Sequence, residues 1–402
     1  YSYGGLFRND MAWFQGDAVR KNPNLKPETT ISKEIGAEVR LLDGRLTADV
    51  TYYDKYTRDQ IVESELSYLS NYQRVIINSG KISNKGWEIS VSGVPVKVKN
   101  FEWKTIFNWS KNNSMVESLP EGIDKIQIGS GVYNVKSYAE VGKPYGAIYA
   151  KTFKRDAEGY ILCQLDGSPK EGQDYEYLGC VQADWRGGWN NVFRLGNFSF
   201  SVMFDFQKGG KFFSQTSIQS SVDGQSVKSL EGRDADFFSR KILGESDEER
   251  YGFMRPQNAN TPTANGQIYP DWGRPKGVVL PNCRYDEDVE GLAGQQVLGY
   301  CTPERYWMHY TSRDISRFIY DASYVKLREI TVSYDLPKKW LRKTPFQTFR
   351  VAAVGRNIAT LFANTPHGLD PQATSTTGNA QGFERGFNLP SATYGFDIKV
   401  SF

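Results

Sequence analysis

The stretch Phe198-Ser-Phe-Ser-Val-Met-Phe-Asp-Phe206 alternates large apolar residues with Ser, Met and Asp. A period of two residues is the pattern of a β-strand whose two faces meet different environments. One face of this strand would be almost wholly aromatic, which a soluble sheet rarely exposes. The stretch therefore points to a strand that borders lipid.

The same alternation recurs along the chain. Between Arg45 and Thr57 the apolar face carries Leu46, Ala48, Val50 and Tyr52, and between Phe101 and Ser110 it carries Phe101, Trp103, Phe107 and Trp109. We predict an all-β chain of about ten barrel strands, at residues 31–42, 45–57, 84–97, 101–112, 142–153, 184–195, 198–208, 322–336, 348–362 and 391–402. The aromatic residues Trp103, Phe107, Trp109, Phe198 and Phe200 are predicted to face lipid or its interface.

Connections between the expected strands alternate in length. Tight turns fall at Asp43-Gly44, Lys99-Asn100 and Gly196-Asn197, whereas long connections fall at 58–77, 113–140, 209–320 and 364–389. Asp-Gly suits the positive φ angles of a tight hairpin turn. Short turns at one end and long loops at the other are typical of outer-membrane barrels, whose long loops are extracellular. One helix is predicted in the longest loop, at Asp234 to Leu243.

Composition excludes several classes of protein. Of the 402 residues, 14% are aromatic, which argues against disorder. No apolar run approaches the length of a membrane-spanning helix, so a chain that crosses a bilayer must do so as a closed barrel. The formal charge is only +3, with no block of Lys and Arg interleaved with aromatics, so nucleic acid is not an expected partner. A soluble β-sandwich is the alternative.

The last strand carries the pattern most clearly. Tyr394, Phe396, Ile398, Val400 and Phe402 share one face, opposite Thr393, Gly395, Asp397, Lys399 and Ser401. A terminal Phe has the form of the signal by which barrel proteins are recognised for insertion into the outer membrane. An ordinary amphipathic edge strand would explain the alternation but not the terminal aromatic.

Four cysteines occur as two loosely spaced pairs, Cys163 with Cys180 and Cys283 with Cys301. We expect disulfides, and with them an oxidising compartment, although free thiols are an alternative and the connectivity is open. Zinc would favour tighter Cys spacing and more histidine than the two that the chain contains. The acidic residues Asp286, Glu287, Asp288 and Glu290 lack the spacing of a dedicated calcium loop, so a solvated loop is expected there.

No catalytic constellation is found, and no cofactor or metal site is expected. His309 and His367 are isolated, and neither a nucleophile elbow nor a glycine-rich phosphate loop occurs. The loop aromatics Tyr269, Trp272, Tyr306, Trp307 and Tyr310 are candidate contacts for a substrate or a partner, because flat rings offer area at little entropic cost. Packing within the loops is the alternative. The nearby Arg305, Arg313 and Arg317 would favour an acidic ligand.

Several motifs together resemble one family. In chain order they are Asn22–Thr29, Asn78–Gly80, Asn84–Glu88, Val141–Gly146, Asp321–Tyr334, Val354–Ile358, Thr360–Phe362, Leu369–Pro371 and Gly378–Gly382, followed by the terminal strand. This series resembles the SusC/RagA type of TonB-dependent outer-membrane transporter. The resemblance covers nearly the whole chain, except the Cys-bearing loops and residues 209–280.

The resemblance implies a transmembrane antiparallel barrel of about 22 strands filled by a plug domain. Residues 1–402 would supply the C-terminal portion of that barrel, about its last ten strands, with the plug and first strands outside this chain. The implied function is active import of a large oligosaccharide or peptide into a Gram-negative bacterium. The implied partners are the TonB complex, acting through the plug, a SusD-like surface lipoprotein, and outer-membrane lipid.

Two other functions stay open. A surface adhesin or carbohydrate-binding β-protein would explain the alternation and disulfides but not the terminal aromatic. A passive porin would share the barrel but would not depend on TonB. The sequence leaves open the identity of the substrate, calcium binding and the oligomeric state.

Overall fold

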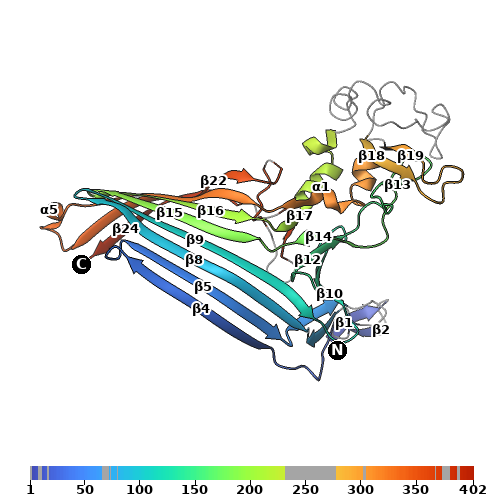
Figure 1. Ribbon diagram of the computed structural model, residues 1–402, viewed down its shortest axis with the longest axis horizontal. Coiled ribbons are helices and arrows are strands. Elements are labelled where there is room, and N and C mark those ends of the chain that lie inside the picture. The colour runs from blue at the N-terminus through green and yellow to red at the C-terminus, as the bar shows by residue number, and fades with distance from the viewer. Residues whose placement is uncertain are drawn as a thin grey trace.

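The computed structural model describes residues 2–7, 11–15, 18–65, 72, 74–78, 80–230, 278–301, 305–366, 368–373, 381–386 and 390–402. Its main feature is a curved nine-stranded sheet in the order β24-β22-β21-β16-β15-β9-β8-β5-β4 (Figure 1). Every neighbouring pair in this sheet is antiparallel. The strands are β4 (Thr29–Leu41), β5 (Leu46–Arg58), β8 (Lys81–Val98), β9 (Phe101–Ser118), β15 (Trp185–Leu195), β16 (Phe198–Lys208), β21 (Tyr324–Asp335), β22 (Thr348–Ala363) and β24 (Thr393–Ser401).

The all-β prediction is confirmed, and nine of the ten expected strands are in this sheet. The tenth prediction, residues 142–153, is wrong as a barrel strand. The structure places only the short β12 (Ala147–Ala150) there, inside a separate sheet. All four of its residues are buried, so its apolar run reflects cover on both faces and not contact with lipid.

The sheet has one apolar and one polar face. Cross-strand register places Ile35, Val50, Ile89, Trp109 and Phe206 on the same face as the lipid-facing residues expected from sequence. Large apolar side chains on this face are exposed, among them Phe107, Phe198, Phe200 and Phe396. Because a strand presents successive side chains to opposite faces, the polar residues between them share the other face.

Tight turns join the strands at one end of the sheet. Asp43 and Gly44 have φ angles of 53° and 81°, so the expected Asp-Gly turn does use positive φ. At this end also lies the short helix α5 (Lys338–Leu341), between β21 and β22 (Figure 1). The long connections gather at the opposite end.

The long connections contain folded structure of their own, which we call the loop assembly (Figure 1). One sheet contains β10 (Lys125–Ser130), β11 (Lys136–Glu140), β12 and β14 (Glu176–Cys180); a second contains β13 (Ile161–Cys163), β18 (Val278–Tyr285) and β19 (Gln296–Cys301); a third contains β17 (Lys211–Ser214), β20 (Ile319–Asp321) and β23 (Phe383–Glu384). Its helical elements are α1 (Gln215–Val222), η2 (Val227–Leu230), the π-helix η4 (Tyr306–Tyr310) and η5 (Ile315–Phe318). The helix expected at Asp234 to Leu243 lies outside the described residues.

Short strands complete the fold near the start of the chain: β1 (Ser2–Phe7) with β2 (Met11–Gln15), and β3 (Val19–Arg20) with β7 (Arg74–Asn78) and β6 (Ile61–Glu65). The buried hydrophobic clusters lie in the loop assembly and where it joins the sheet. One cluster includes Phe153, Cys283 and Trp307, a second includes Ile148, Phe213 and Phe383, and a third includes Ile82, Val116 and Ile126. The loop assembly therefore has its own core, whereas the apolar face of the sheet is open.

Candidate functional site on the polar face of the sheet

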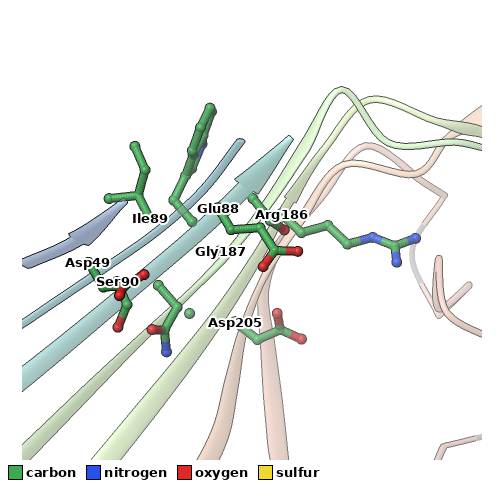
Figure 2. A pocket seen from close by; sticks show the side chains of 11 residues that line it. Asp49, Glu88, Ile89, Ser90, Arg186, Gly187 and Asp205 are labelled. Carbon is green, nitrogen blue, oxygen red and sulfur yellow. The ribbon is translucent and has the colours of Figure 1, made fainter. Parts of the chain in front are cut away.

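A row of polar residues crosses five neighbouring strands on the polar face. Asp49 pairs with Ser90, Ser90 with Asn108, Asn108 with Gly188, and Gly188 with Asp205. These positions line a hollow of about 380 Å³ together with Glu88, Ser110 and Arg186. Figure 2 shows Ile89 pointing away from the side on which Glu88 and Asp205 lie. The charged side chains of the hollow therefore lie on the polar face.

Gly188 leaves room for this hollow. A Cβ at this position would meet only the Phe204 carbonyl oxygen at 3.7 Å and the Met203 Cε at 4.0 Å, both ordinary contacts. An alanine would therefore fit at this position without a clash. The surrounding groups are three carboxylates, Asp49, Glu88 and Asp205, and the Arg186 guanidinium, which donates to Gln207 Oε1 at 3.0 Å. Such a surface can bind polar or charged groups of a ligand in water.

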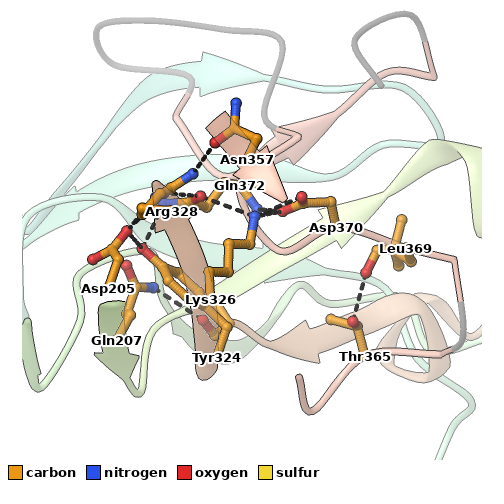
Figure 3. Close-up of polar contacts among 11 residues, drawn as sticks. Asp205, Gln207, Tyr324, Lys326, Arg328, Asn357, Thr365, Leu369, Asp370 and Gln372 are labelled. Atoms are coloured by element: carbon orange, nitrogen blue, oxygen red, sulfur yellow. Dashed lines mark hydrogen bonds and ion pairs between the residues drawn. The ribbon is translucent and has the colours of Figure 1, made fainter. Parts of the chain in front are cut away.

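Asp205 connects this hollow to a hydrogen-bond network (Figure 3). Its Oδ2 accepts from Arg328 Nε at 2.8 Å, from Arg328 Nη2 at 2.7 Å and from the Tyr324 hydroxyl at 3.1 Å. Arg328 also donates to Asn357 Oδ1 at 2.8 Å. Charge-assisted bonds of this kind are stronger than neutral ones, so β16, β21 and β22 are tied together at this point.

Lys326 extends the network into the loop assembly. It is only 4% exposed, and its Nζ lies 2.5 Å from both carboxylate oxygens of Asp370 and 2.9 Å from Gln372 Oε1. A buried ammonium is stable only when it is paired and hydrogen-bonded. Asp370 and Gln372 follow β22 in the chain, so this ion pair fixes residues 368–373 against the barrel wall (Figure 3).

A β-bulge in β21 assembles these groups. The register shifts between Leu327 and Glu329 against β22, and between Met203 and Phe204 of β16. Arg328 and Glu329 are adjacent, yet Arg328 bonds Asp205 and Glu329 pairs with Arg356 at 2.9 Å on the same face. A bulge places two consecutive side chains on one face, as this pair requires. The signal in the sequence was the Arg-Glu pair that interrupts the alternation from Tyr324 to Tyr334, and sequence reasoning missed it.

A second hollow of about 580 Å³ lies in the loop assembly. It is lined by hydroxyl side chains of α1, by Lys228 and Glu384, and by Pro366, Leu369 and Asp370. Glu384 accepts from Ser214 Oγ and Thr216 Oγ1, both at 2.6 Å, so its carboxylate is already bound within the protein. Asp370 of this hollow pairs with Lys326, and Asp205 of the first hollow pairs with Arg328. Lys326 and Arg328 both donate to Gln372 Oε1, so the two hollows are linked through this network.

Three of the aromatic residues expected to contact a substrate or a partner lie instead in a buried core of the loop assembly. Tyr306, Trp307 and Tyr310 are 1 to 2% exposed and belong to the core cluster around Phe153. Their burial favours the packing alternative over contact with a substrate. Arg305 pairs with Asp166 at 2.9 Å and Arg313 lies over the Tyr310 ring, while Arg317 donates to the Tyr306 hydroxyl. Tyr269 and Trp272 lie outside the described residues.

The structure contains no disulfide between the expected cysteines. Cys163, Cys180, Cys283 and Cys301 are all free. Cys163 hydrogen-bonds with Cys283, on the neighbouring strand β18, whereas Cys180 lies on β14 in another sheet. The hydrogen bond with Cys283 and burial raise the pKa of the Cys163 thiol, and burial raises the pKa of Cys301 to about 12. Spacing in the sequence paired Cys163 with Cys180, but its neighbour in space is Cys283.

The acidic loop is partnered by lysines. Asp286 is 2% exposed and lies 2.9 Å from Lys154 Nζ and 2.7 Å from Lys170 Nζ. Burial would raise the pKa of Asp286, but hydrogen bonds from Lys170, Lys154 and the Glu287 backbone outweigh burial and lower it to about 2. Lys170 also pairs with Asp288. The described part of the chain contains no cluster of His, Cys, Asp or Glu arranged to hold a metal ion.

The expected insertion strand is β24. Tyr394, Phe396, Ile398, Val400 and Phe402 are 76%, 86%, 62%, 37% and 76% exposed. Tyr394, Phe396 and Ile398 pair with Gly355, Ala353 and Val351 of β22, so they share the apolar face. Among the helices that the structure describes, none is long and apolar enough to cross a membrane.

Known proteins resemble this chain in sequence. Residues 1–147 match the family described as TonB dependent receptor-like, beta-barrel. TonB-dependent receptor P3 of Formosa agariphila is 25% identical over 395 residues, which are 93% of this chain and 33% of that receptor. TonB-dependent receptor SusC of Bacteroides thetaiotaomicron is 29% identical over 104 residues, covering 26% of this chain and 10% of SusC. The chain thus spans about a third of the length of the P3 receptor.

Solved structures resemble it in fold. The RagAB peptide transporter matches with a TM-score of 0.59 and 16% identity, over 95% of this chain and 36% of that one. The RagAB peptide importer in its closed-closed state matches with a TM-score of 0.60 at the same identity and coverage. At this identity the likeness concerns the fold, and it confirms the prediction of an antiparallel barrel wall. In sequence and in fold, the resemblance of this chain to the SusC/RagA type of TonB-dependent receptor is confirmed.

Proposed function

We propose that this chain forms part of the wall of an outer-membrane importer for a large nutrient, an oligosaccharide or a peptide. The observation that carries the proposal is the two-faced sheet. Its apolar face, with exposed rings such as Phe107 and Phe396, suits lipid, whereas its polar face carries a water-accessible hollow. A sheet with these two faces separates a bilayer from an aqueous passage.

The open edges support a larger barrel. β4 and β24 each have one neighbour in the described sheet, so each has a row of unpaired backbone groups. Unpaired edges are not stable in a hydrocarbon layer, which lacks hydrogen-bonding partners. In this proposal the sheet is the C-terminal portion of a barrel of about 22 strands that is filled by a plug.

Direction and partners complete the proposal. The loop assembly lies outside the cell, and the tight turns face the periplasm, as in other barrels of this type. A SusD-like lipoprotein covers the loop assembly, and the substrate passes along the polar face when TonB acts on the plug. RagAB is named as a peptide transporter, which supports a peptide as one of the two candidate substrates.

Uptake in the native bacterium tests the proposal. Cells with and without the receptor, and cells with and without TonB, would receive fluorescent oligosaccharides and peptides of matched size. We expect uptake only when both the receptor and TonB are present. Uptake without TonB would instead show a passive porin.

Deletion of Phe402 separates the importer from an adhesin. We expect the deletion to abolish insertion of the receptor into the outer membrane, measured by membrane fractionation. A soluble adhesin would be secreted unchanged. The control is Phe346→Ala, which removes the ring that lies 5.3 Å from Phe402 but leaves the terminal residue in place.

A further inference from the structure

The segment between β21 and β22 concentrates positive charge at the end of the sheet that carries the tight turns. Lys338, Lys339, Arg342 and Lys343 lie within six residues, together with Trp340, and we call these five residues the basic turn. All five are exposed, and Trp340 is 60% exposed. Figure 1 shows α5 far from the loop assembly. Neither the polar hollow nor the Lys326 network uses this segment.

The basic turn is held in a defined conformation. Leu341 is 6% exposed and anchors α5, while Trp340 N donates to the Pro337 carbonyl at 2.9 Å and Thr344 N donates to the Leu341 carbonyl at 2.9 Å. Leu336 N also donates to the Phe349 carbonyl of β22 at 2.8 Å. The charged side chains therefore project from a fixed backbone, which lowers the entropic cost of binding a ligand.

The four charges have no acidic partner among the residues that the structure describes. No ion pair joins Lys338, Lys339, Arg342 or Lys343 to a described carboxylate. The nearby Asp335 is already bound by Arg350, whose Nε lies 2.6 Å from Asp335 Oδ1. An uncompensated cluster of this kind attracts anions within about 10 Å at moderate ionic strength.

Aromatic side chains place the basic turn beside the apolar face. The Phe346 ring lies 6.0 Å from that of Phe349 and 5.3 Å from that of Phe402. Phe349 pairs with Val400, which belongs to the apolar face, and Phe402 is 76% exposed. Exposed Trp and Phe next to Lys and Arg are the combination found where a membrane protein passes from hydrocarbon to headgroups.

We propose that the basic turn binds the headgroups of anionic phospholipids in the periplasmic leaflet of the outer membrane. The ammonium and guanidinium groups pair with lipid phosphates, and Trp340 lies at the boundary between headgroups and acyl chains. A soluble phosphate or an anionic polymer would account for the charges but would not need the exposed rings. The inference rests on the proposed function, because that proposal places the tight turns in the periplasm.

Lipid retention by the whole receptor tests the inference. Receptor purified in mild detergent would be mixed with equal amounts of phosphatidylglycerol and phosphatidylcholine, and bound lipid would be counted by native mass spectrometry. The test variant carries Lys338→Gln, Lys339→Gln, Arg342→Gln and Lys343→Gln. We expect the unaltered receptor to retain phosphatidylglycerol selectively and the variant to retain about tenfold less of it, since each basic residue near an anionic surface contributes.

The chain offers a matched control. Lys33, Lys55, Lys111 and Lys208 are also exposed, form no ion pair with any described carboxylate, and lie in the strand halves away from the tight turns. Changing these four to Gln removes the same net charge. We expect this control to keep its phosphatidylglycerol, and an equal loss in both variants would show that only net charge matters.

Quenching of Trp340 by lipids with brominated acyl chains gives an independent reading in vesicles that contain phosphatidylglycerol. Because Trp103 and Trp109 also face lipid in this arrangement, we expect Trp340→Phe to remove only the Trp340 contribution to the quenching. The Gln variant should lower the quenching by no more than that contribution. No preference for phosphatidylglycerol in the unaltered receptor, or binding to isolated peptidoglycan in place of lipid, would overturn the inference. Uptake is measured separately, so a receptor that retains lipid but does not import would contradict the proposed function alone.

Discussion

Lys326 has an unusual position for a lysine, since it is 4% exposed within a membrane-type sheet. Its stability depends on Asp370, which lies 44 positions later in the chain and 2.5 Å away. Removing one partner of a buried pair costs more than removing both, because the remaining charge has no compensation. Asp370 therefore holds residues 368–373 against the sheet and compensates the buried charge of Lys326.

We expect Asp370→Ala to destabilise the folded receptor by about 3 kcal/mol, because it leaves Lys326 buried and unpaired. Heat-induced loss of the compact form on denaturing gels, followed in detergent, measures the effect. The double variant Asp370→Ala with Lys326→Met should recover part of the lost stability, because no unpaired charge stays buried. Residues 368–373 should also become accessible to a protease in the single variant.

Asp49→Ala is the control for this experiment. Asp49 is exposed on the same polar face and forms no ion pair among the described residues, so its removal should change stability by less than about 0.5 kcal/mol. If Asp370→Ala and Asp49→Ala lost the compact form at the same midpoint temperature, the role assigned to the ion pair between Lys326 and Asp370 would be contradicted.

At the scale of the element, strand β8 depends on a glycine. Gly86 pairs with Tyr53, and a Cβ at Gly86 would lie 2.3 Å from both the Tyr53 Oη and the Lys111 carbonyl oxygen. Tyr53 covers this position and donates to Asn112 Oδ1 at 3.1 Å, while Asn112 Nδ2 donates to Asn84 Oδ1 at 3.1 Å. A glycine inside a strand often marks such a close approach.

Gly86→Ala should destabilise the sheet by about 1 to 3 kcal/mol, because the added methyl group forces Tyr53 and the β9 backbone apart. The same gel measurement reports the shift in midpoint temperature. Gly93→Ala, on the same strand, is the control, since its Cβ would meet nothing closer than 3.5 Å. A shift as large for Gly93→Ala as for Gly86→Ala would rule out this explanation.

Strand patterns explain which elements could be predicted from sequence. Long strands such as β5 and β16 separate lipid from water, so their alternation is nearly complete and their positions were predicted within a few residues. β12 and β13 are short and buried, so the same pattern does not apply to them. The bulge at Arg328 could not be predicted from alternation, because that pattern assumes one phase along the whole strand and the register of β21 shifts between Leu327 and Glu329.

Ion pairs between residues far apart in the chain could not be predicted from the sequence. Arg328 and Asp205 are 123 positions apart, and Lys170 and Asp286 are 116 positions apart. Each residue was visible in the sequence as a charged group, but only the three-dimensional fold determines which opposite charge lies beside it. The same holds for Cys163, whose neighbour Cys283 belongs to the other predicted pair.

At the scale of the whole molecule, function depends on which face of the sheet meets water. Phe107 and Asn108 are adjacent in β9, both are exposed, and they lie on opposite faces. Phe107 is opposite Trp189 on the apolar face, whereas Asn108 lines the polar hollow opposite Gly188. In the membrane these two neighbours should therefore meet different solvents.

Single cysteines at these two positions test this arrangement in outer-membrane vesicles. A charged thiol reagent should modify Asn108→Cys at least about tenfold faster than Phe107→Cys, because a thiol in hydrocarbon stays protonated and out of reach of the reagent. The four native thiols are the background, measured in the unaltered receptor, and burial keeps Cys301 protonated through a pKa of about 12. In denaturant both variants should react equally. Faster modification of Phe107→Cys in vesicles would mean that the rings line the aqueous passage and that the polar face meets another surface, in which case the sheet could not be the wall of an importer.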